Sequence, residues 1–307
     1  VRELEPYVPG EQPKIQNILK LNTNENPYPP SPKVVEAVQH VLANSADALR
    51  LYPDPDASEL KAAIAKQQKV PVEQVFVGNG SDEVLAHIFK AFFVQELPLL
   101  YPDITYSFYP VYSQFFGVDT KVLPLNDQFE IVVDDYKQPN GGIIITNPNA
   151  PTSIDLGLAK IEEILQANPN SVVVIDEAYV DFGAESAVSL VAKYDNLVVC
   201  QTTSKSRSLA GLRVGFAIAQ PHLIAALEAV KNSFNSYPID RFAIAAAVAS
   251  FEDQAYFEAQ NAKVIASREH LVEQLTQLSF KVLPSTSTFI CATLPSQIAF
   301  ELASLLR

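Results

Sequence analysis

The sequence has 307 residues, of which 48% are hydrophobic and 19% charged, as expected of a globular protein with room for one large and one smaller domain. Its formal net charge of −13 argues against a nucleic-acid partner, because binding phosphates needs a basic surface. Its two cysteines lie in apolar, strand-like runs, and neither a secretory leader nor a membrane-spanning run is apparent, so we expect a soluble cytoplasmic protein.

The first part of the chain predicts an extended arm followed by two helices. Four prolines between residues 27 and 32 exclude a helix there, so this segment is expected to lie extended over a surface. Apolar residues at helical spacing then predict helices over residues 33–43 and 57–69. Between these helices, the proline-flanked Tyr52 is expected in a loop.

A glycine-rich turn after residue 77 has two interpretations. The short apolar run 74–77 predicts a strand, which leads through Gly-Asn-Gly-Ser-Asp-Glu into a helix. A strand, a glycine turn and a helix N-terminus together form a cradle for a phosphate, because the free N–H groups and the helix dipole favour an anion. A plain helix start capped by Ser81 or Asp82 explains the same residues equally well.

The middle of the chain alternates strands and helices. Aromatic residues crowd the segment 101–116, where one ring could stack on a flat ligand while most belong to the core. Buried strands are predicted over 142–146, 171–175 and 196–201. This alternation predicts a largely parallel sheet covered on both faces, and ligands bind at the carboxyl ends of the strands in such sheets.

Polar side chains follow four of the predicted strands, so we expect them to form one pocket at the carboxyl edge of the sheet; they lie at 79–82, 147–149, 176–179 and 204–205. Asp176 follows a run of β-branched apolar residues, and a buried carboxylate is costly unless it is paired. A protonated pyridine nitrogen would be a suitable partner. If that pyridine ring also carries a phenolic oxygen, the Tyr179 hydroxyl could donate a hydrogen bond to this oxygen.

Lys205 and Arg213 indicate what this pocket binds. Both lie in a segment rich in serine and threonine, just past the strand predicted over 196–201. A lysine can form an imine with an aldehyde, and an arginine with neighbouring hydroxyls can hold a phosphate. Pyridoxal 5′-phosphate (PLP) carries both groups. A solvated basic turn is the alternative for this segment taken alone, but its agreement with the other strand ends favours a PLP pocket.

The rest of the chain predicts a smaller domain. A long helix is expected over 217–237, a helical pattern over 239–278, and two strands over 280–283 and 288–293. The four histidines are scattered without the spacing of a metal site, so no metal is expected.

These patterns divide the chain into three parts. We expect an N-terminal arm with part of the small domain at 1–44, a large cofactor-binding domain at 45–238, and a small C-terminal domain at 239–307.

Seven motifs run through the chain in a specific order: Glu-Pro-Tyr-Val-Pro-Gly, Leu-Asn-Thr-Asn-Glu-Asn-Pro, Leu-Tyr-Pro-Asp, Gly-Asn-Gly-Ser-Asp-Glu, Asn-Pro-Asn-Ala-Pro-Thr, Asp-Glu-Ala-Tyr and Ser-Lys-Ser-Arg-Ser-Leu-Ala-Gly-Leu-Arg-Val-Gly-Phe. Together they resemble the histidinol-phosphate aminotransferases, which are PLP enzymes of fold type I. The likeness covers essentially the whole chain. It implies an α/β fold, with a mostly parallel seven-stranded sheet sandwiched by helices and a smaller α+β domain.

The resemblance also implies roles at the cofactor. Lys205 would carry it and move the proton, and Asp176 would pair with the pyridine nitrogen and keep the ring an electron sink. Tyr179 and Asn149 would face the ring oxygen, and Tyr106 would stack on the ring. The residues implied around the cofactor phosphate are Ser81, Asp82, Thr202, Ser204 and Arg213.

Other implied contacts involve a second subunit and the substrate. Tyr52 would reach the phosphate of the other subunit's cofactor, which implies a homodimer with shared active sites. Tyr7, Asn24 and Asn26 would lie by the substrate.

The implied reaction is transamination of L-histidinol phosphate with 2-oxoglutarate. An aromatic aminotransferase or a phosphothreonine decarboxylase is an alternative, since these enzymes share the lysine, aspartate and arginine. A non-catalytic PLP-binding module of a regulator is a second alternative, and it would need a DNA-binding segment that this acidic sequence lacks.

Two features depart from the family pattern. Many relatives have two adjacent asparagines where this chain has Asn149-Ala150. The family also ends in a pair of arginines that help to hold the substrate, and Arg307 matches neither, so the sequence is expected to be part of a longer polypeptide.

Overall fold

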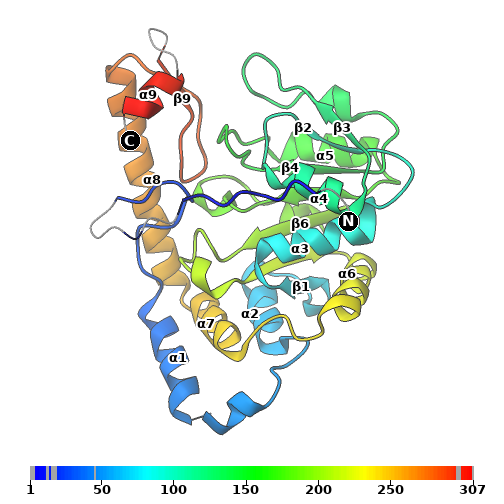
Figure 1. The fold of residues 1–307 in the computed structure, drawn as a ribbon, viewed down its shortest axis with the longest axis vertical. Helices are drawn as coiled ribbons and strands as arrows, with labels where there is room; N and C mark the ends of the chain where they lie inside the picture. Colours follow the sequence, from blue (N-terminus) through cyan, green and yellow to red (C-terminus); the bar gives the residue numbers. More distant parts are fainter. Residues whose placement is uncertain (1–3, 12–13, 15–18, 45, 295–298, 306–307) are drawn as a thin grey trace.

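The fold is an α/β sandwich built on one large sheet (Figure 1). The computed structural model describes residues 4–11, 14, 19–44, 46–294 and 299–305. The strands of the large sheet are β1 (Val75–Gly78), β2 (Leu99–Pro102), β3 (Thr120–Leu123), β4 (Gly142–Thr146), β5 (Val173–Asp176), β6 (Leu197–Thr202) and β7 (Gly215–Ala219). The helices are α1 (Pro32–Asn44), α2 (Ser58–Gln68), α3 (Gly80–Ile88), α4 (Phe108–Phe116), α5 (Leu158–Ala167), α6 (Pro221–Phe234), α7 (Arg241–Glu252), α8 (Gln254–Gln277) and α9 (Ala299–Leu305).

The direction of the strands brings the predicted polar turns to one edge. Within the described residues, the sheet has seven strands in the order β1-β7-β6-β5-β4-β2-β3. The pairs from β6 through β5, β4 and β2 to β3 are parallel, whereas β7 is antiparallel to both β6 and β1. β1 therefore runs in the same direction as β4, β5 and β6. The mostly parallel sheet predicted from the sequence is confirmed.

Two apolar layers cover the sheet. On one face α3, α4 and α6 pack against a buried cluster that contains Val174 and Val198. On the other face α2, α5 and α7 pack against a cluster that contains Val173, Ile175 and Val199. This assignment follows the alternation of side chains along a strand. Each of these fully buried aliphatic side chains contributes about 1.5–3 kcal/mol of transfer free energy.

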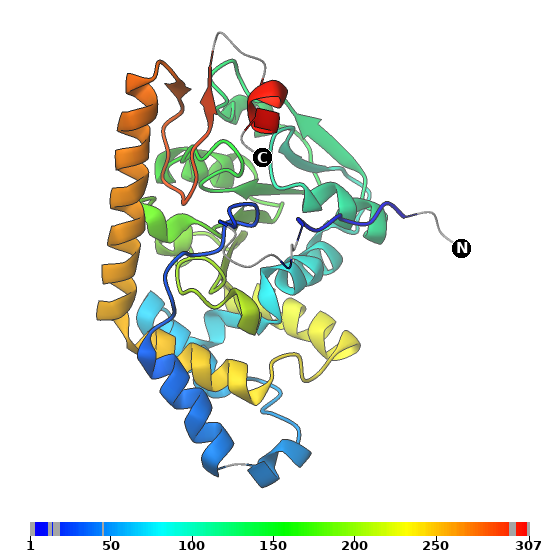
Figure 2. The ribbon, with the colours of Figure 1, turned by 60° about the vertical axis from the view of Figure 1, so that its left-hand side comes forward.

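The last part of the chain forms a smaller unit beside the sheet. The long helix α8 runs along one side of the molecule and contacts a two-stranded antiparallel sheet of β8 (Lys281–Val282) and β9 (Ala292–Thr293), as Figure 2 shows. α7 belongs elsewhere, because Ala243, Ala247 and Phe251 join the buried cluster on the large sheet. The domain boundary at residue 238 stays a prediction.

The structure corrects one expectation, adds two strands that were not predicted and resolves one predicted helical pattern into two helices. The long helix predicted over 217–237 is wrong at its start, because Gly215–Ala219 is the strand β7 and the helix α6 begins only at Pro221. A short apolar run buried on both faces has no periodicity that separates strand from helix. The strands β2 and β3 were not predicted. The helical pattern over 239–278 is two helices, which meet at Asp253.

The described residues of the N-terminal arm, 4–11, 14 and 19–31, lie across the molecule without helix or strand, as predicted for the proline-rich segment (Figures 1 and 2). Near its start the backbone N–H of Glu5 donates to Gln114 Oε1 on α4 at 2.9 Å. Tyr7 stacks on Phe108, with ring centroids 4.7 Å apart. None of the helices among the described residues combines the length and the apolar character needed to cross a membrane.

Candidate active site

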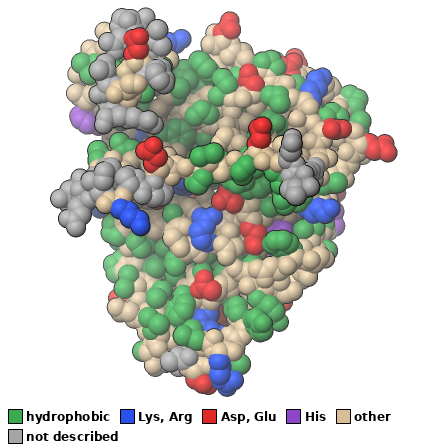
Figure 3. Space-filling view, viewed as in Figure 1, with side chains coloured by type: hydrophobic (Ala, Val, Ile, Leu, Met, Phe, Trp, Pro, Cys, Tyr) green, Lys and Arg blue, Asp and Glu red, His purple; other side chains and the backbone are tan. Residues whose placement is uncertain are grey.

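The predicted polar turns meet in one cavity of about 140 Å³ at the carboxyl edge of the sheet. In the space-filling view, acidic and basic side chains lie close together near the middle of this face (Figure 3). Nine predicted cofactor residues line the cavity, together with Thr146, Ala150 and Ala178; the nine are Ser81, Asp82, Tyr106, Asp176, Tyr179, Thr202, Ser204, Lys205 and Arg213. The convergence expected from the strand ends is therefore present in the structure.

Lys205 lies just past the end of β6, and its amine points into this cavity. Its Nζ donates to the backbone oxygen of Thr23 in the N-terminal arm at 2.7 Å. The amine also lies 5.7 Å from the centroid of the Tyr179 ring. Burial lowers the pKa of Lys205, because desolvation disfavours its charged form. A lysine amine that deprotonates more easily is a better nucleophile and a better proton acceptor.

Asp176 is the last residue of β5 and is almost fully buried. Its Oδ2 accepts a hydrogen bond from the Tyr109 hydroxyl at 2.9 Å, while its Oδ1 is buried without a partner. Burial raises the pKa of Asp176 to about 6, against the opposing effect of hydrogen bonds from Tyr109 and the Ala178 backbone. An unpaired buried carboxylate oxygen is costly. The site is therefore suited to a ligand that brings a hydrogen-bond donor, and a positive charge, to Oδ1.

A cradle for an anion lies at the other end of the cavity. It is formed where the start of α3 approaches the end of the β6–β7 connection. Gly80 has a φ of +82°, and a Cβ there would lie 2.3 Å from a guanidinium nitrogen of Arg213. A Cβ on Gly215 would lie 2.3 Å from the backbone nitrogen of Ser81. Only glycine permits this close approach of the two segments.

The polar groups of this cradle suit a phosphate. Arg213 Nη2 donates to Asp82 Oδ2 at 3.0 Å, and the Thr202 hydroxyl donates to Ser204 Oγ at 3.0 Å. Ser81 lies in the first turn of α3. A guanidinium, several hydroxyls and the free N–H groups of a helix start are the groups that bind phosphate in proteins. The helix start capped by Ser81 or Asp82 is wrong, because the N-cap residue of α3 is Asn79 and no side chain caps the helix, while the anion cradle stays a prediction.

Two tyrosines line the cavity between these ends. The Tyr106 hydroxyl donates to Asp82 Oδ1 at 3.1 Å, and its ring meets Tyr109 edge to face. The Tyr179 hydroxyl accepts from Asn24 Nδ2 at 3.1 Å. Burial raises the pKa of both hydroxyls, so each stays protonated near neutral pH and can donate a hydrogen bond.

The N-terminal arm closes one side of the site. Besides the contact of Asn24 with Tyr179, Asn26 Nδ2 donates to the backbone oxygen of Lys205 at 3.0 Å. The predicted substrate residues Asn24 and Asn26 therefore contact two residues that line the cavity, although neither lines the cavity itself. Tyr7, in the N-terminal arm, is 39% exposed, and its ring packs against Phe108 of α4. It is not among the residues that line the cavity.

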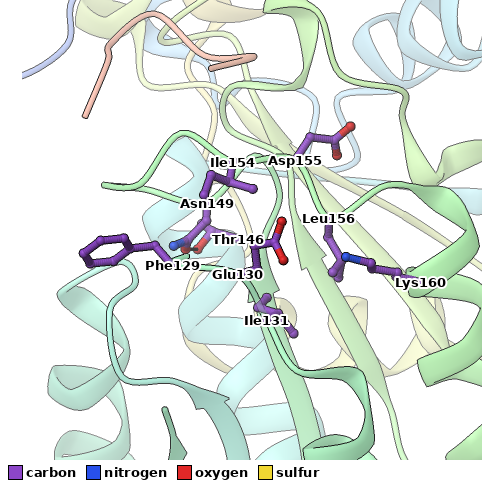
Figure 4. Close-up of a pocket in the computed structure, with 9 residues that line it drawn as sticks. All are labelled: Phe129, Glu130, Ile131, Thr146, Asn149, Ile154, Asp155, Leu156 and Lys160. Atoms are coloured by element: carbon purple, nitrogen blue, oxygen red, sulfur yellow. Dashed lines mark hydrogen bonds between the residues drawn. The ribbon is translucent and has the colours of Figure 1, made fainter. Parts of the chain in front are cut away.

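Two predicted cofactor residues do not line the cavity. Asn149 faces a separate space of about 20 Å³, where it lies beside Thr146 (Figure 4). Its Oδ1 accepts from the Thr146 hydroxyl at 3.0 Å and its Nδ2 donates to the Ile104 backbone at 2.9 Å. Tyr52 is 78% exposed and stacks on Tyr237.

The sequence did not single out Tyr109 or Thr146 as site residues. Tyr109 is one of many aromatic residues in 101–116, and nothing in the sequence marks the ring that reaches Asp176. Thr146 had a detectable signal, since it is the last residue of β4 and so ends at the same edge as Asp176. Among the described residues, no group of three or more histidine, cysteine or acidic side chains could hold a metal ion.

Comparison with known proteins defines the family. The family model "Aminotransferase class I and II" matches residues 16–307. The chain therefore belongs to the class I and II aminotransferases, and the predicted fold type I is confirmed.

Two similar curated proteins are named as histidinol-phosphate aminotransferases. The histidinol-phosphate aminotransferase of Acinetobacter baumannii (strain SDF) is 80% identical over 307 residues, which are 100% of this chain and 85% of that protein. The histidinol-phosphate aminotransferase 2 of Dechloromonas aromatica is 62% identical over 308 residues, covering 100% of this chain and 86% of that protein. A crystal structure of the Sinorhizobium meliloti histidinol-phosphate aminotransferase in complex with pyridoxal-5′-phosphate has a TM-score of 0.77 and 22% identity, covering 88% of this chain and 74% of that one.

The expected cofactor, PLP, is confirmed by the family. The residues of the cavity also fit it. The unpaired Asp176 Oδ1 suits the protonated pyridine nitrogen, the Lys205 amine suits the aldehyde, and the cradle at Arg213 suits the phosphate.

Proposed function

We propose that this protein transfers the amino group of L-histidinol phosphate to 2-oxoglutarate, giving imidazole-acetol phosphate and L-glutamate in histidine biosynthesis. The observation that carries the chemistry is a single cavity with Lys205, the unpaired Asp176 Oδ1 and the cradle at Arg213. The choice of substrate is supported by 80% identity to a histidinol-phosphate aminotransferase along the whole chain.

Bound PLP supplies an electron sink, which makes the α-proton of the attached amino compound acidic. Lys205 Nζ would be the amine that holds the aldehyde, and the same nitrogen would accept and return the α-proton. Burial lowers the pKa of Lys205, so this amine is unprotonated more often than an exposed lysine would be. Asp176 Oδ1, which is buried without a partner, would accept a hydrogen bond from the pyridine nitrogen and favour its protonated form.

The other cavity residues orient the reacting groups. Arg213, with Ser81, Thr202 and Ser204, holds the cofactor phosphate and so fixes the position of the ring. Tyr106 and Tyr179 also line the cavity, where Tyr106 would pack against the cofactor ring and the Tyr179 hydroxyl would donate to the ring oxygen. Asn24, in the N-terminal arm, donates a hydrogen bond to the Tyr179 hydroxyl. A movement of the arm would therefore also move the group that donates to the ring oxygen.

We further propose that the enzyme is a homodimer in which the partner subunit's Tyr52 completes each phosphate site. Tyr52 is 78% exposed and is absent from the cavity of its own chain. A large exposed ring on a proline-flanked loop is available to a second molecule. The same surface on both chains would form a two-fold contact. Tyr7, Asn24 and Asn26 lie on the arm and are proposed to face the substrate.

We also infer a cytoplasmic location for the enzyme. Cys200 is buried, Cys291 is half-buried, and both are free thiols, as in proteins of a reducing compartment.

The test is a half-reaction followed by the absorbance of the cofactor. The PLP-loaded enzyme should convert fully to its amino form with L-histidinol phosphate and return with 2-oxoglutarate. Faster conversion by an aromatic amino acid would indicate an aromatic aminotransferase, and release of CO₂ from phosphothreonine would indicate a decarboxylase. No spectral change with any of them would argue for a binding module.

A further inference from the structure

A buried lysine, Lys231, donates a hydrogen bond to the backbone of the loop that carries Tyr52. Tyr52 is followed by Pro53 and Pro55, and its ring stacks on Tyr237 with centroids 4.5 Å apart. Three residues after Tyr52, the backbone oxygen of Pro55 accepts from Lys231 Nζ at 3.0 Å. Because both prolines restrict φ, displacement of the Pro55 carbonyl is transmitted to Tyr52.

Lys231 lies on α6 and its side chain is only 2% exposed. Its ammonium also pairs with Glu228 Oε2 at 2.8 Å. Glu228 is shared, because its Oε1 accepts from Lys61 Nζ at 2.6 Å. Burial alone would raise the pKa of Glu228, but the hydrogen bonds from Lys231 and Lys61 outweigh burial and lower it, so Glu228 is ionised.

This arrangement makes the Pro55 carbonyl a necessary partner. A buried ammonium is costly unless it is paired and its N–H groups are hydrogen-bonded. One carboxylate serves two cations here, and Asp56 lies 3.9 Å from Lys231 Nζ with 65% of its side chain exposed. The Pro55 oxygen therefore provides a contact that the surroundings do not replace.

The loop has a second cationic contact and a fixed end. Arg241, at the start of α7, donates to the backbone oxygens of Leu51 at 3.4 Å and Tyr52 at 3.3 Å. Asp54 accepts from the Ser58 backbone at 2.8 Å and so ties the loop to the start of α2. Backbone groups on both sides of Tyr52 are thus held, while its ring remains exposed.

We propose that Lys231, assisted by Arg241, is a positioning residue that holds the Tyr52 loop in the conformation used by the partner subunit's active site. The inference rests on the proposed shared site and adds the groups that prepare Tyr52 for it. Its distinctive consequence is that loss of Lys231 impairs the site of the other chain and spares the site of its own.

The first measurement is hydrogen exchange of the purified dimer, which does not depend on activity. Lys231→Met should expose the backbone amides of residues 49–57, with exchange faster by roughly ten- to hundredfold, as expected for loss of a charged hydrogen bond. Lys66→Met, which changes an exposed lysine on α2, is the matched control and should exchange like the wild type. Unchanged exchange in Lys231→Met would overturn the proposal.

The second measurement is subunit mixing. Lys231→Met chains are mixed with an excess of inactive Lys205→Ala chains under conditions where subunits exchange. In the mixed dimer, the intact Lys205 belongs to the Lys231→Met chain, and that site receives Tyr52 from a chain whose loop is normal. Activity for each Lys231→Met chain should therefore rise from roughly a tenth of the wild-type value, or less, to about the wild-type value.

The control mixture separates the two proposals. Tyr52→Phe chains mixed with Lys205→Ala chains should recover activity for the same reason. Recovery there, without recovery for Lys231→Met, would show that Lys231 acts within its own chain and would overturn this inference alone. No recovery in the control would reject the shared site, and this inference with it.

Folding of the variant is checked before either experiment. If Lys231→Met does not give a folded dimer by circular dichroism, Arg241→Gln replaces it, because Arg241 is at the surface of the loop contact. Faster exchange over residues 49–57 and recovery on mixing are expected for Arg241→Gln as well. An Arg241→Gln variant that shows neither faster exchange over residues 49–57 nor recovery on mixing would contradict the proposal.

Discussion

The Tyr109 hydroxyl donates to Oδ2 of Asp176 at 2.9 Å, which leaves Oδ1 of the same carboxylate free to face the cavity. This bond favours the ionised carboxylate, whereas burial favours the neutral acid. Tyr109 therefore orients Asp176 and also limits how far its pKa rises.

Replacing this hydroxyl should shift the pH dependence of the reaction. In Tyr109→Phe the pKa of Asp176 should rise further above about 6, so less of the carboxylate is ionised at pH 6–7. We expect kcat/KM to fall roughly tenfold in that range, with partial recovery at higher pH. The measurement is the pH profile of kcat/KM. Tyr101→Phe, a change at another buried tyrosine, should keep the wild-type profile.

Removal of the Asp176 charge should be far more severe. Asp176→Asn should still bind PLP, because the phosphate cradle is intact, but transamination should fall by several orders of magnitude when the ring nitrogen loses its counter-charge. Single-turnover absorbance with L-histidinol phosphate measures the loss.

The neighbouring residue provides the control for that experiment. Glu177 is also buried, but its carboxylate faces the other side of the sheet, where it accepts from Ser186, Gln201 and the Ala187 backbone. Glu177→Gln should keep activity within about tenfold of the wild type. Equal losses in the two variants would mean that buried charge, and not contact with the ring, explains the effect of Asp176→Asn.

Chemical trapping should identify the nucleophile. Borohydride reduction of the PLP-loaded enzyme, followed by peptide mapping, should attach the cofactor to Lys205. Lys205 is the only lysine among the residues that line the cavity. Lys205→Ala should give no stable adduct, and label on a different lysine of the wild type would reject the assignment.

Glu177 should also govern how stability changes with pH. Burial raises the pKa of Glu177 to about 7 from 4.5, so between these values the folded state keeps a proton that the unfolded state has lost. The free energy of unfolding of the apoenzyme should therefore fall as pH rises through this range, by on the order of 3 kcal/mol from this group. In Glu177→Gln the decrease between pH 5 and 8, measured by urea unfolding, should be smaller. An unchanged slope would show that Glu177 does not titrate there.

The sequence predicted the main cavity residues because each follows a strand. Asp176 ends β5 and Lys205 lies shortly after the end of β6, and parallel strands place their carboxyl ends together. Arg213 could be assigned because it lies among hydroxyls close to Lys205 in sequence. Family resemblance supplied the role of Tyr106, one of many aromatic residues in 101–116, whereas Ser81 already stood among the polar residues after the strand predicted over 74–77.

What the sequence did not reveal depends on tertiary contacts. Residues 217–219 were read as the start of a helix because Ala217, Ile218 and Ala219 are all buried in the sheet and show no alternation. Tyr109 and Phe108 are adjacent aromatic residues, and only the packing of α4 decides which reaches Asp176. Asn149 was expected in the cavity, but its side chain accepts a hydrogen bond from Thr146 and donates one to the Ile104 backbone oxygen.

The antiparallel pairing of β6 with β7 has a consequence for the geometry of the cofactor. Thr202 and Gly215 are paired across these strands, so residues 203–214 form a closed loop whose two ends are fixed in the sheet. Lys205 and Arg213 both belong to this loop. The spacing between the group that takes the aldehyde and the group that takes the phosphate is therefore limited by the length of one segment, and the arm adds the contacts of Thr23 and Asn26 with Lys205. A single-residue insertion or deletion in this loop would alter that spacing while leaving every side chain present, so the length of the loop is more tightly constrained than the identity of its exposed residues.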